Sequence, residues 1–273
     1  MKPFSEHVEK GFIRVPAKEV KLKEVVSFDD KFSTGVLVIK MKGIVKQHLA
    51  ITDGALYVKD GKFLYKFYRE RGKALIPGSS IKGAVRTYAE AFLGDKTTKA
   101  IFGSTACASH VKFDDVLVEE KSLKLEPFDS IIMANPKQEK SVKLYTLKPS
   151  QEIRRRNDAL IEVLPEGYNF TTEICAEGLS YEQITALLFC FGIADGYMFY
   201  VKMGRGKNLG MGAVHFHLEQ STLYKSFFPE DNTKIIQDLM SKQKVENFLK
   251  GHGIKPEELQ KNILSKIMDG ETS

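Results

Sequence analysis

LIPGSSIKGAVR, residues 75–86, is the stretch on which the predicted fold depends. Pro77 favours an extended conformation at the residue before it, and Gly78 allows a backbone turn that a side chain would hinder. Ser79 or Ser80 can then cap a helix by accepting hydrogen bonds from its first backbone N–H groups. The stretch therefore predicts an extended segment, a tight turn and the start of a helix.

The predicted helix runs from Ser80 to about Leu93 and has two different faces. Its apolar residues recur at helical spacing and would face a core: Ile81, Val85, Tyr88 and Phe92. Lys82 and Arg86 lie on another face, near the start of the helix. Because a helix N-terminus carries partial positive charge and unpaired N–H donors, this arrangement predicts a phosphate site. A capped surface helix with ordinary basic residues is the alternative.

Three further motifs follow in order along the chain. Residues 101–104 read IFGS, residues 162–170 read EVLPEGYNF, and residues 203–212 read the glycine-rich MGRGKNLGMG. Together with residues 76–86, these motifs resemble the RAMP superfamily, the RNA-binding proteins that build type III CRISPR effector complexes. The resemblance covers roughly residues 36–218, and four motifs in one order are far more specific than a single glycine motif.

The order of predicted elements favours an α+β fold with a ferredoxin-like (RRM-like) core, insertions and a C-terminal helical extension. Hydrophobic patterning predicts strands at residues 36–45, 111–118, 168–176, 197–202 and 212–218, and helices at 80–93 and 180–191. The core order of strand, helix, strand, strand, helix and strand is the ferredoxin-like arrangement, which RNA-recognition modules share. Ser180 and Gln183 form a capping box at the start of the second helix.

We expect three parts in the chain: an N-terminal arm at residues 1–34, a core at 35–220 and a C-terminal helical extension at 221–273. The core carries an insertion at about 119–167, which has four prolines and no clean period. Such a segment is either a functional excursion or disordered. By position alone, the resemblance places at residues 127–150 a thumb that displaces a base of the guide–target duplex.

The glycine-rich loop at residues 203–212 offers both backbone N–H groups and cations to a phosphate. Glycines let the backbone approach a phosphate closely, and Lys and Arg neutralise its charge. The loop is neither a P-loop, whose spacing it lacks, nor a dinucleotide fingerprint, because a strand rather than a helix follows. A hairpin with a glycine-rich tip is the alternative.

We expect RNA contacts from the helix start, the glycine-rich loop and the insertion. The candidate residues are Ser79, Ser80, Lys82, Arg86, Gly204, Arg205, Gly206, Lys207, Asn208, Gly210, Arg154 and Arg155. The last two belong to a run of three arginines, which is either a phosphate clamp or a solvated charge run.

The resemblance also implies a catalytic aspartate. In the backbone subunits that cleave target RNA, a loop between the first strand and the Pro-Gly-Ser-Ser motif supplies an aspartate near the scissile phosphate. Asp53 and Asp60 lie in that interval, although Asp60 also suits the Asp-Gly turn of a hairpin at residues 56–65. His48, just after the first strand, is a third candidate as an acid or base. Cleavage would use a divalent cation, Mg²⁺ or Mn²⁺, and a catalytically silent subunit is the alternative.

Composition sets the remaining expectations. The 273 residues include 41 Lys+Arg and 35 Asp+Glu, and this net charge of +6 permits a nucleic-acid partner without requiring one. No apolar run is long enough to span a membrane, no signal-peptide core is present, and the three cysteines form no CxxC pair, so we expect a cytoplasmic protein. His215 and His217 share a strand face, but no further ligand is spaced for a metal, so we expect none bound by the subunit alone.

These features favour an RNA-binding subunit of a type III CRISPR ribonucleoprotein, which holds guide RNA and its target RNA duplex in antiviral defence. Whether it also cleaves the target RNA or is catalytically silent stays open at this point. Its partners would be the two RNAs, other RAMP subunits and the large subunit of the complex. Three alternatives stay open. They are a non-catalytic end-capping RAMP subunit, a stand-alone guide-processing endoribonuclease that uses His48, and a scaffold that binds only proteins.

Overall fold

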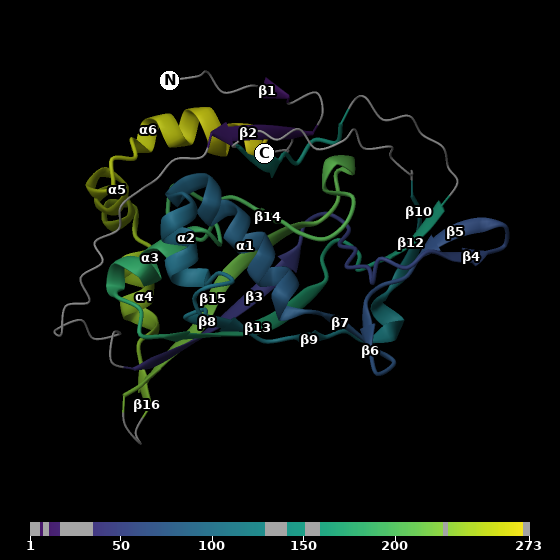
Figure 1. Cartoon of the computed structure of the whole chain (residues 1–273), viewed down its shortest axis with the longest axis horizontal. Helices are drawn as coiled ribbons and strands as arrows, with labels where there is room; N and C mark the ends of the chain where they lie inside the picture. Colours follow the sequence, from purple (N-terminus) through teal and green to yellow (C-terminus); the bar gives the residue numbers. More distant parts are fainter. Residues whose placement is uncertain are drawn as a thin grey trace.

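The computed structural model describes residues 6–7, 11–16, 35–128, 141–150, 159–225 and 229–269. Within these ranges, helices pack against a curled antiparallel sheet, and smaller sheets extend from it (Figure 1). The predicted α+β class is confirmed.

The largest sheet has the strand order β14-β15-β3-β13-β8, and its pairings are antiparallel. Its strands are β3 (Val36–Val45), β8 (Val111–Phe113), β13 (Asn169–Glu177), β14 (Val201–Lys202) and β15 (Ala213–Tyr224), and β16 (Pro229–Asp231) pairs with the end of β15. The first strand of the predicted core therefore lies in the middle of the sheet, between β13 and β15.

The alternation of side chains along β3 shows which face of the sheet meets the core. Leu37, Ile39 and Met41 are buried, whereas Lys40 and Lys42 lie on the opposite, half-exposed face. Because side chains alternate with a period of two, a shift of one residue would exchange the two faces. This hydrophobic pattern fixes the register of the central strand.

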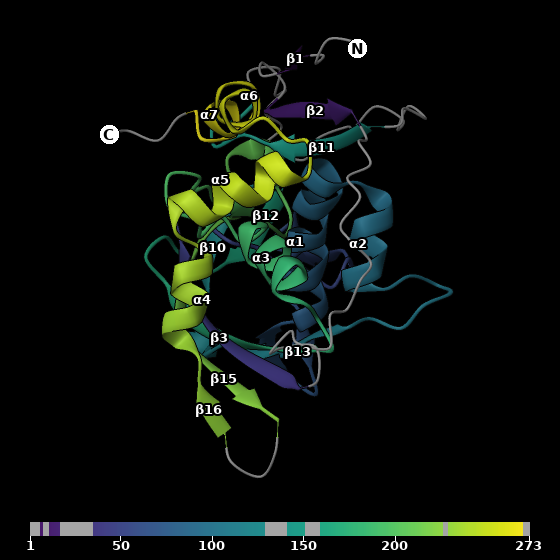
Figure 2. The ribbon, with the colours of Figure 1, turned by 90° about the vertical axis from the view of Figure 1, so that its left-hand side faces the viewer.

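Two helices cover the buried face of the sheet, α1 (Gly78–Leu93) and α3 (Tyr181–Phe189) (Figures 1 and 2). Aromatic rings join them to the segment before β14. The ring centroids of Tyr88 and Phe199 are 4.9 Å apart, and those of Phe92 and Phe189 are 5.5 Å apart. Such pairs contribute about 0.5–1.5 kcal/mol each beyond the area that they bury.

The capping box predicted for the second helix is confirmed. The backbone N–H of Gln183 donates to Ser180 Oγ at 3.2 Å, and the backbone N–H of Ser180 donates to Gln183 Oε1 at 2.9 Å. Both interactions satisfy donors that the first helical turn would otherwise leave unpaired. The start of α3 is thus determined locally.

A second sheet, with the order β10-β12-β5-β4, projects at the right of Figure 1. Its strands are β4 (Tyr57–Lys59), β5 (Lys62–Tyr65), β10 (Lys124–Phe128) and β12 (Ala159–Val163). Asp60 and Gly61 connect β4 to β5 with φ angles of +50° and +75°. Positive φ at both central positions is the requirement of a type I′ turn, so the predicted Asp-Gly hairpin is confirmed.

The predicted lack of regular structure at residues 119–167 is wrong for the described part of that segment. It contains the short helix η2 (Glu120–Ser122) and the strands β10, β11 (Ser141–Tyr145) and β12. β12 pairs in parallel with β5, and β11 pairs with β2 (Phe12–Pro16). These strands depend on partners far away in the chain, which local periodicity does not reveal.

The remaining elements are short or lie in the C-terminal part of the chain. They are β1 (Glu6–His7), β6 (Arg69–Glu70), β7 (Lys73–Ile76), β9 (Val116–Leu117), α2 (Asp95–Phe102), the turn η3 (Lys207–Leu209), α4 (Thr233–Leu239), α5 (Lys242–Gly251), α6 (Pro256–Leu259), the π-helical turn η4 (Gln260–Leu264) and α7 (Ser265–Ile267). In the part of the chain that the structure describes, no helix has both the length and the apolar character needed to cross a membrane.

Candidate nucleic-acid interface

The N-terminus of α1 is capped by a residue from another segment. The helix begins at Gly78, and the Oδ1 atom of Asp115 accepts a hydrogen bond from the Gly78 backbone N–H at 2.7 Å. Neither Ser79 nor Ser80 caps the helix, so that prediction is wrong. A carboxylate of the protein itself therefore already occupies the position next to the helix dipole, where a phosphate was expected.

Gly78 is required by the packing of the chain. A Cβ atom at this position would lie 2.0 Å from the carbonyl oxygen of Phe113, the last residue of β8. No side chain fits at such a distance. The glycine of the Pro-Gly-Ser-Ser motif therefore lets α1 start directly against β8.

Lys82 and Arg86 face a hollow between α1, α2 and the loop at residues 103–109. The Nζ atom of Lys82 donates to Ser109 Oγ at 2.6 Å and to the Val111 carbonyl at 3.1 Å. Arg86 forms an ion pair with Glu90 at 3.0 Å and lies close enough to lower the pKa of Lys82, although burial is the larger cause. Both cations are thus partly engaged inside the protein.

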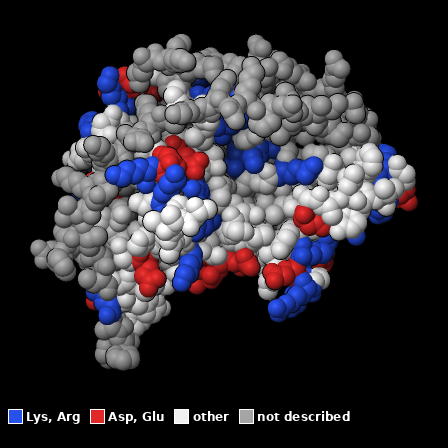
Figure 3. Space-filling view, viewed as in Figure 1, with Lys and Arg blue, Asp and Glu red and all other residues white. Residues whose placement is uncertain are grey.

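A different cavity lies on another side of α1, and we call it the lysine cavity. It has a volume of about 370 Å³, and its walls come from α1, β11, the end of β14 and the glycine-rich loop. The lining residues are Ser79, Ser80, Gly83, Ala84, Thr87, Tyr88, Lys143, Leu144, Tyr145, Lys202, Met203, Gly204 and Lys207. Among these described residues are three lysines and no Asp or Glu. Figure 3 shows Lys and Arg side chains gathered in a hollow in the upper middle of this face.

Lys202 is the most unusual of the three lysines. Its side chain is buried, with 4% of the residue exposed, and its Nζ atom donates to Gln47 Oε1 at 2.6 Å. Gln47 is oriented in turn by its Nε2 atom, which donates to the Leu147 carbonyl at 2.8 Å. Burial, with a further contribution from the charge of Lys207, lowers the pKa of Lys202 to about 7.

Lys202 is missing from the residues expected from sequence. It ends a mainly apolar run, YMFYVK at residues 197–202, whose pattern predicts a strand. The signal that could have found it is a lysine in such a run directly before the glycine-rich loop. Lysine side chains are rarely buried unless they are paired with another group.

Lys207 and Lys143 complete the cationic wall of the cavity. The Nζ atom of Lys207 donates to the Gly204 carbonyl at 3.1 Å and lies 5.3 Å from the centre of the Tyr145 ring, and burial lowers its pKa. The Nζ atom of Lys143 lies 4.7 Å from the centre of the Phe12 ring. Of the residues predicted from sequence to bind RNA, the structure brings Ser79, Ser80, Gly204 and Lys207 together here.

The glycines of the loop serve its conformation. Gly204, Gly206, Gly210 and Gly212 all have φ between +74° and +80°. A Cβ atom on Gly204 would lie 2.2 Å from the Ala50 carbonyl oxygen, whereas one on Gly210 would meet Pro149 Cβ at 3.4 Å. At least the first glycine is therefore needed for the fold itself, in addition to any contact with a phosphate.

Four predicted RNA contacts in this loop, Arg205, Gly206, Asn208 and Gly210, are not among the residues that line the lysine cavity. The guanidinium carbon of Arg205 lies 4.0 Å from the centre of the Tyr65 ring, next to the second sheet. The carbonyl of Asn208 accepts from the Ser150 backbone N–H at 2.7 Å. Arg154 and Arg155 lie outside the described residues.

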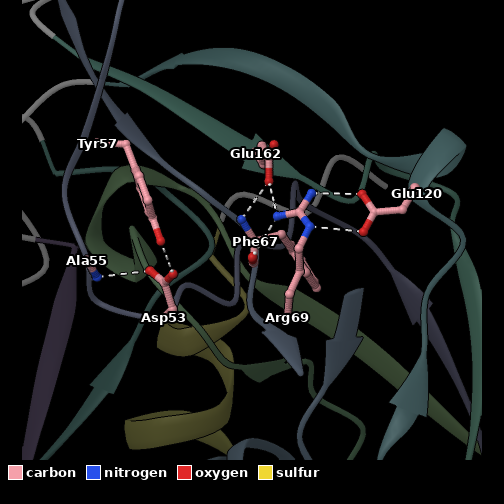
Figure 4. Close-up of polar contacts among 7 residues, drawn as sticks. All are labelled: Asp53, Ala55, Tyr57, Phe67, Arg69, Glu120 and Glu162. Atoms are coloured by element: carbon pink, nitrogen blue, oxygen red, sulfur yellow. Dashed lines mark hydrogen bonds and ion pairs between the residues drawn. The ribbon is translucent and has the colours of Figure 1, made fainter. Parts of the chain in front are cut away.

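Asp53, the first catalytic candidate, is exposed in the loop before β4 (Figure 4). Its Oδ1 atom accepts from the Ala55 backbone N–H at 2.9 Å, and its Oδ2 atom accepts from the Tyr57 hydroxyl at 3.0 Å. The second of these interactions raises the pKa of Tyr57. Asp60 is exposed at the tip of the β4–β5 hairpin. Its positive φ angle is the one that the type I′ turn requires, and aspartate tolerates this conformation better than most residues.

His48 lies where three segments meet. Its Nδ1 atom accepts from the Glu166 backbone N–H at 3.3 Å, which requires the proton of a neutral ring to be on Nε2. Its carbonyl accepts from the backbone N–H of Gly212, at the end of the glycine-rich loop. His48 thus contributes to holding this loop against the segment that precedes β13.

An ion-pair cluster beside Asp53 anchors the second sheet (Figure 4). Arg69 forms a bidentate pair with Glu120, at 2.9 and 2.8 Å, and a further ion pair with Glu162 at 2.8 Å. The same Glu162 oxygen accepts from the Phe67 backbone N–H. The hydrogen bonds from Arg69 lower the pKa of Glu120, and the two ion pairs of Arg69 hold β6, β12 and η2 together.

The described residues include no group of three or more His, Cys, Asp or Glu side chains that could hold a metal ion. The rings of His215 and His217 are 4.1 Å apart, on the same strand face as predicted. Asp53 alone supplies one carboxylate, which does not fit a metal site built only from protein.

Comparison with known proteins identifies the family. The model of the RAMP superfamily matches residues 50–215, more than half of the chain. The matching solved structures, 179 chains in all, include one from the "Cryo-EM structure of the Type III-B Cmr-beta bound to cognate target RNA". That chain shares 16% identity at a TM-score of 0.43, and the match covers 71% of this chain and 62% of that chain, which is less than two thirds of its length. No curated protein matches. Since the family model spans both α1 and the glycine-rich loop, the chain belongs to the RAMP superfamily.

Proposed function

We propose that this protein is an RNA-binding subunit of a type III CRISPR ribonucleoprotein, and that it holds the guide RNA and its duplex with target RNA. The observation that carries the proposal is the lysine cavity. Lys143, Lys202 and Lys207 surround it, and Asp and Glu are absent from its described lining. A cavity with this charge favours a phosphate group.

The chemistry of the cavity suits contacts that do not depend on base sequence. Lysine ammonium groups and the hydroxyls of Ser79, Ser80 and Thr87 bind phosphate oxygens without reading bases. Specificity for the target would then come from base pairing with the guide, as in other RNA-guided effectors. The expected partners are both RNAs, other RAMP subunits and the large subunit of the complex, in the cytoplasm.

The topology supports a ferredoxin-like core for this function. The order β15-β3-β13-β8, with α1 between β3 and β8 and α3 between β13 and β15, agrees with the arrangement of strand, helix, strand, strand, helix and strand. RNA-recognition modules share this arrangement. The lysine cavity lies at one edge of this core, beside α1 and β14.

Cleavage of target RNA is the second function that we propose, with Asp53 as the reacting residue. The observation that favours Asp53 is its orientation, because two hydrogen bonds fix an exposed carboxylate. A divalent cation at this position would have to be held largely by RNA phosphates and water, which is how Mg²⁺ is commonly bound. Asp60 and His48 are the other candidates.

Sizing the purified chain with RNA tests the proposed role. A backbone subunit is expected to form RNA-dependent assemblies that grow with RNA length. One copy bound at an RNA end would favour the end-capping role, and multiple-turnover cleavage by the isolated chain would favour the processing enzyme. Failure to bind guide-length RNA at low salt would contradict the proposal in all its forms.

A further inference from the structure

The buried amino group of Lys202 has a neutral partner. Its Nζ atom donates to the amide oxygen of Gln47, and the described lining of the lysine cavity brings no carboxylate to it. Buried charges in proteins are ordinarily paired with an opposite charge or bind an ion. When Lys202 is protonated, its charge therefore lacks compensation within the described residues.

The described titratable groups around Lys202 are lysines and tyrosines, which bring it no negative charge. Lys207 approaches from η3, Lys143 and Tyr145 from β11, and Tyr88 from α1. The Nζ atom of Lys46 lies 5.8 Å from the centre of the Tyr200 ring, which precedes Lys202 on the chain. The described charged groups that line the cavity are all cations, and the charge of Lys207 disfavours the protonated form of Lys202.

The helix that borders the cavity is held in place by hydrogen bonds to the strand that carries Lys202. The backbone N–H of Lys202 donates to the Tyr88 hydroxyl at 3.0 Å, and that hydroxyl donates to the Tyr200 carbonyl at 3.2 Å. α1 and the strand that carries Lys202 are thus joined next to the cavity. Gly83, on the same wall, has open space where a Cβ atom would be.

We propose that the lysine cavity binds one phosphate group of RNA together with a proton, which Lys202 takes up from the solvent as the phosphate enters. This inference rests on the proposed function and specifies how the site works. The incoming phosphate supplies the negative charge that the cavity lacks. The Nζ atom of Lys202 changes from amine to ammonium, and the proton comes from the buffer.

Proton uptake makes RNA affinity dependent on pH. Because the pKa of Lys202 is about 7 in the free protein and rises when a phosphate lies beside it, the affinity falls as the pH increases above 7. One linked proton limits the effect to about tenfold per pH unit. Below pH 7, Lys202 is already protonated and its contribution to the pH dependence disappears.

Calorimetric titration with RNA in two buffers of different ionisation enthalpy, at about pH 7.5, measures the proton uptake directly. We expect the wild type to take up a substantial fraction of one proton, and Lys202→Met to take up much less and bind RNA more weakly. Lys202→Arg keeps a permanent charge and should bind RNA without the uptake. Lys121→Met, at a side chain 83% exposed, is the control and should behave as the wild type.

Lys207→Met keeps the test valid if the Lys202 variants fail to fold. Removing the charge of Lys207 raises the pKa of Lys202 in the free protein, so the uptake at the same pH should decrease. RNA binding by Lys207→Met with the proton uptake of the wild type, or the same result for Lys202→Met where it folds, would overturn the inference and leave the proposed function intact. Absence of RNA binding by the wild type at any pH would overturn both.

Discussion

The ammonium nitrogen of Lys202 lies 2.6 Å from the amide oxygen of Gln47, a residue 155 positions earlier in the chain. This contact joins the exit of β3 to the strand before the glycine-rich loop, and it places an amino group of lowered pKa inside a cavity whose other described charged residues are lysines. The lysine cavity is thus assembled from segments that lie far apart in the sequence.

Lys202 gives the stability of the free protein a specific pH dependence. Its pKa is about 7 in the folded state, below the ordinary 10.5, so the unfolded chain binds more protons between these values. The free energy of unfolding should therefore rise with pH above 7, by at most about 1.4 kcal/mol per unit. Urea unfolding of the wild type and Lys202→Met at several pH values measures this, and parallel curves for the two proteins would contradict it.

Gly83→Ala separates stability from RNA binding. A Cβ atom at Gly83 meets nothing within 4 Å, so alanine should stabilise α1 by about 0.5–1 kcal/mol. The methyl group enters the lysine cavity, and RNA affinity should fall roughly tenfold, or 1.4 kcal/mol. Gly251→Ala, at an equally open position in α5, is the matched control. It should leave RNA affinity unchanged, and equal affinities for all three proteins would argue against a phosphate beside Gly83.

Two glycines of the loop should respond differently to alanine. In Gly204→Ala the new Cβ atom would lie 2.2 Å from the Ala50 carbonyl oxygen. We therefore expect the free energy of unfolding to fall by about 2 kcal/mol or more, and RNA binding to be lost with it. In Gly210→Ala only the left-handed conformation is unfavourable, at roughly 1–2 kcal/mol. Thermal unfolding of both variants measures the difference, and a larger effect at Gly210 would be inconsistent with the loop described here.

Asp53→Asn tests the proposed cleavage in an assembled complex. The amide oxygen can still accept from the Ala55 backbone N–H, so the loop should persist while cleavage of labelled target RNA is lost. Tyr57→Phe removes the other hydrogen bond of Asp53 and keeps the carboxylate, so it should retain cleavage. Both reactions are followed with and without a chelator. Cleavage by Asp53→Asn at the wild-type rate would assign the chemistry to another group.

The parts of the fold that the sequence predicts correctly are those determined by neighbouring residues. The capping box of Ser180 and Gln183 and the turn at Asp60 and Gly61 each depend on a few consecutive positions. The predicted cap of α1 by Ser79 or Ser80 is wrong, because the residue that caps the helix, Asp115, is 37 positions away from Gly78. Such a partner follows only from the tertiary structure.

In the candidate site, too, the sequence predicts the residue of a local motif and misses those that depend on distant partners. Lys207 was expected from the glycine-rich motif, and it lines the cavity. The importance of Lys202 depends on burial and on Gln47, so its sequence context alone suggested a strand residue. Lys143 lies on β11, whose pairing with β2 no local pattern indicated.

The salt dependence of RNA affinity tests the central claim most directly, in a comparison of the wild type with the double variant Lys143→Met/Lys207→Met. If both lysines contact phosphates, the slope of log affinity against log salt should become less steep by about 1.4, because each lost contact removes about 0.7 for single-stranded RNA. The control is Lys121→Met/Lys255→Met, which removes the same charge from side chains 83% and 76% exposed and should keep the wild-type slope. Equal slopes for the two double variants would contradict the assignment of the lysine cavity as the RNA site.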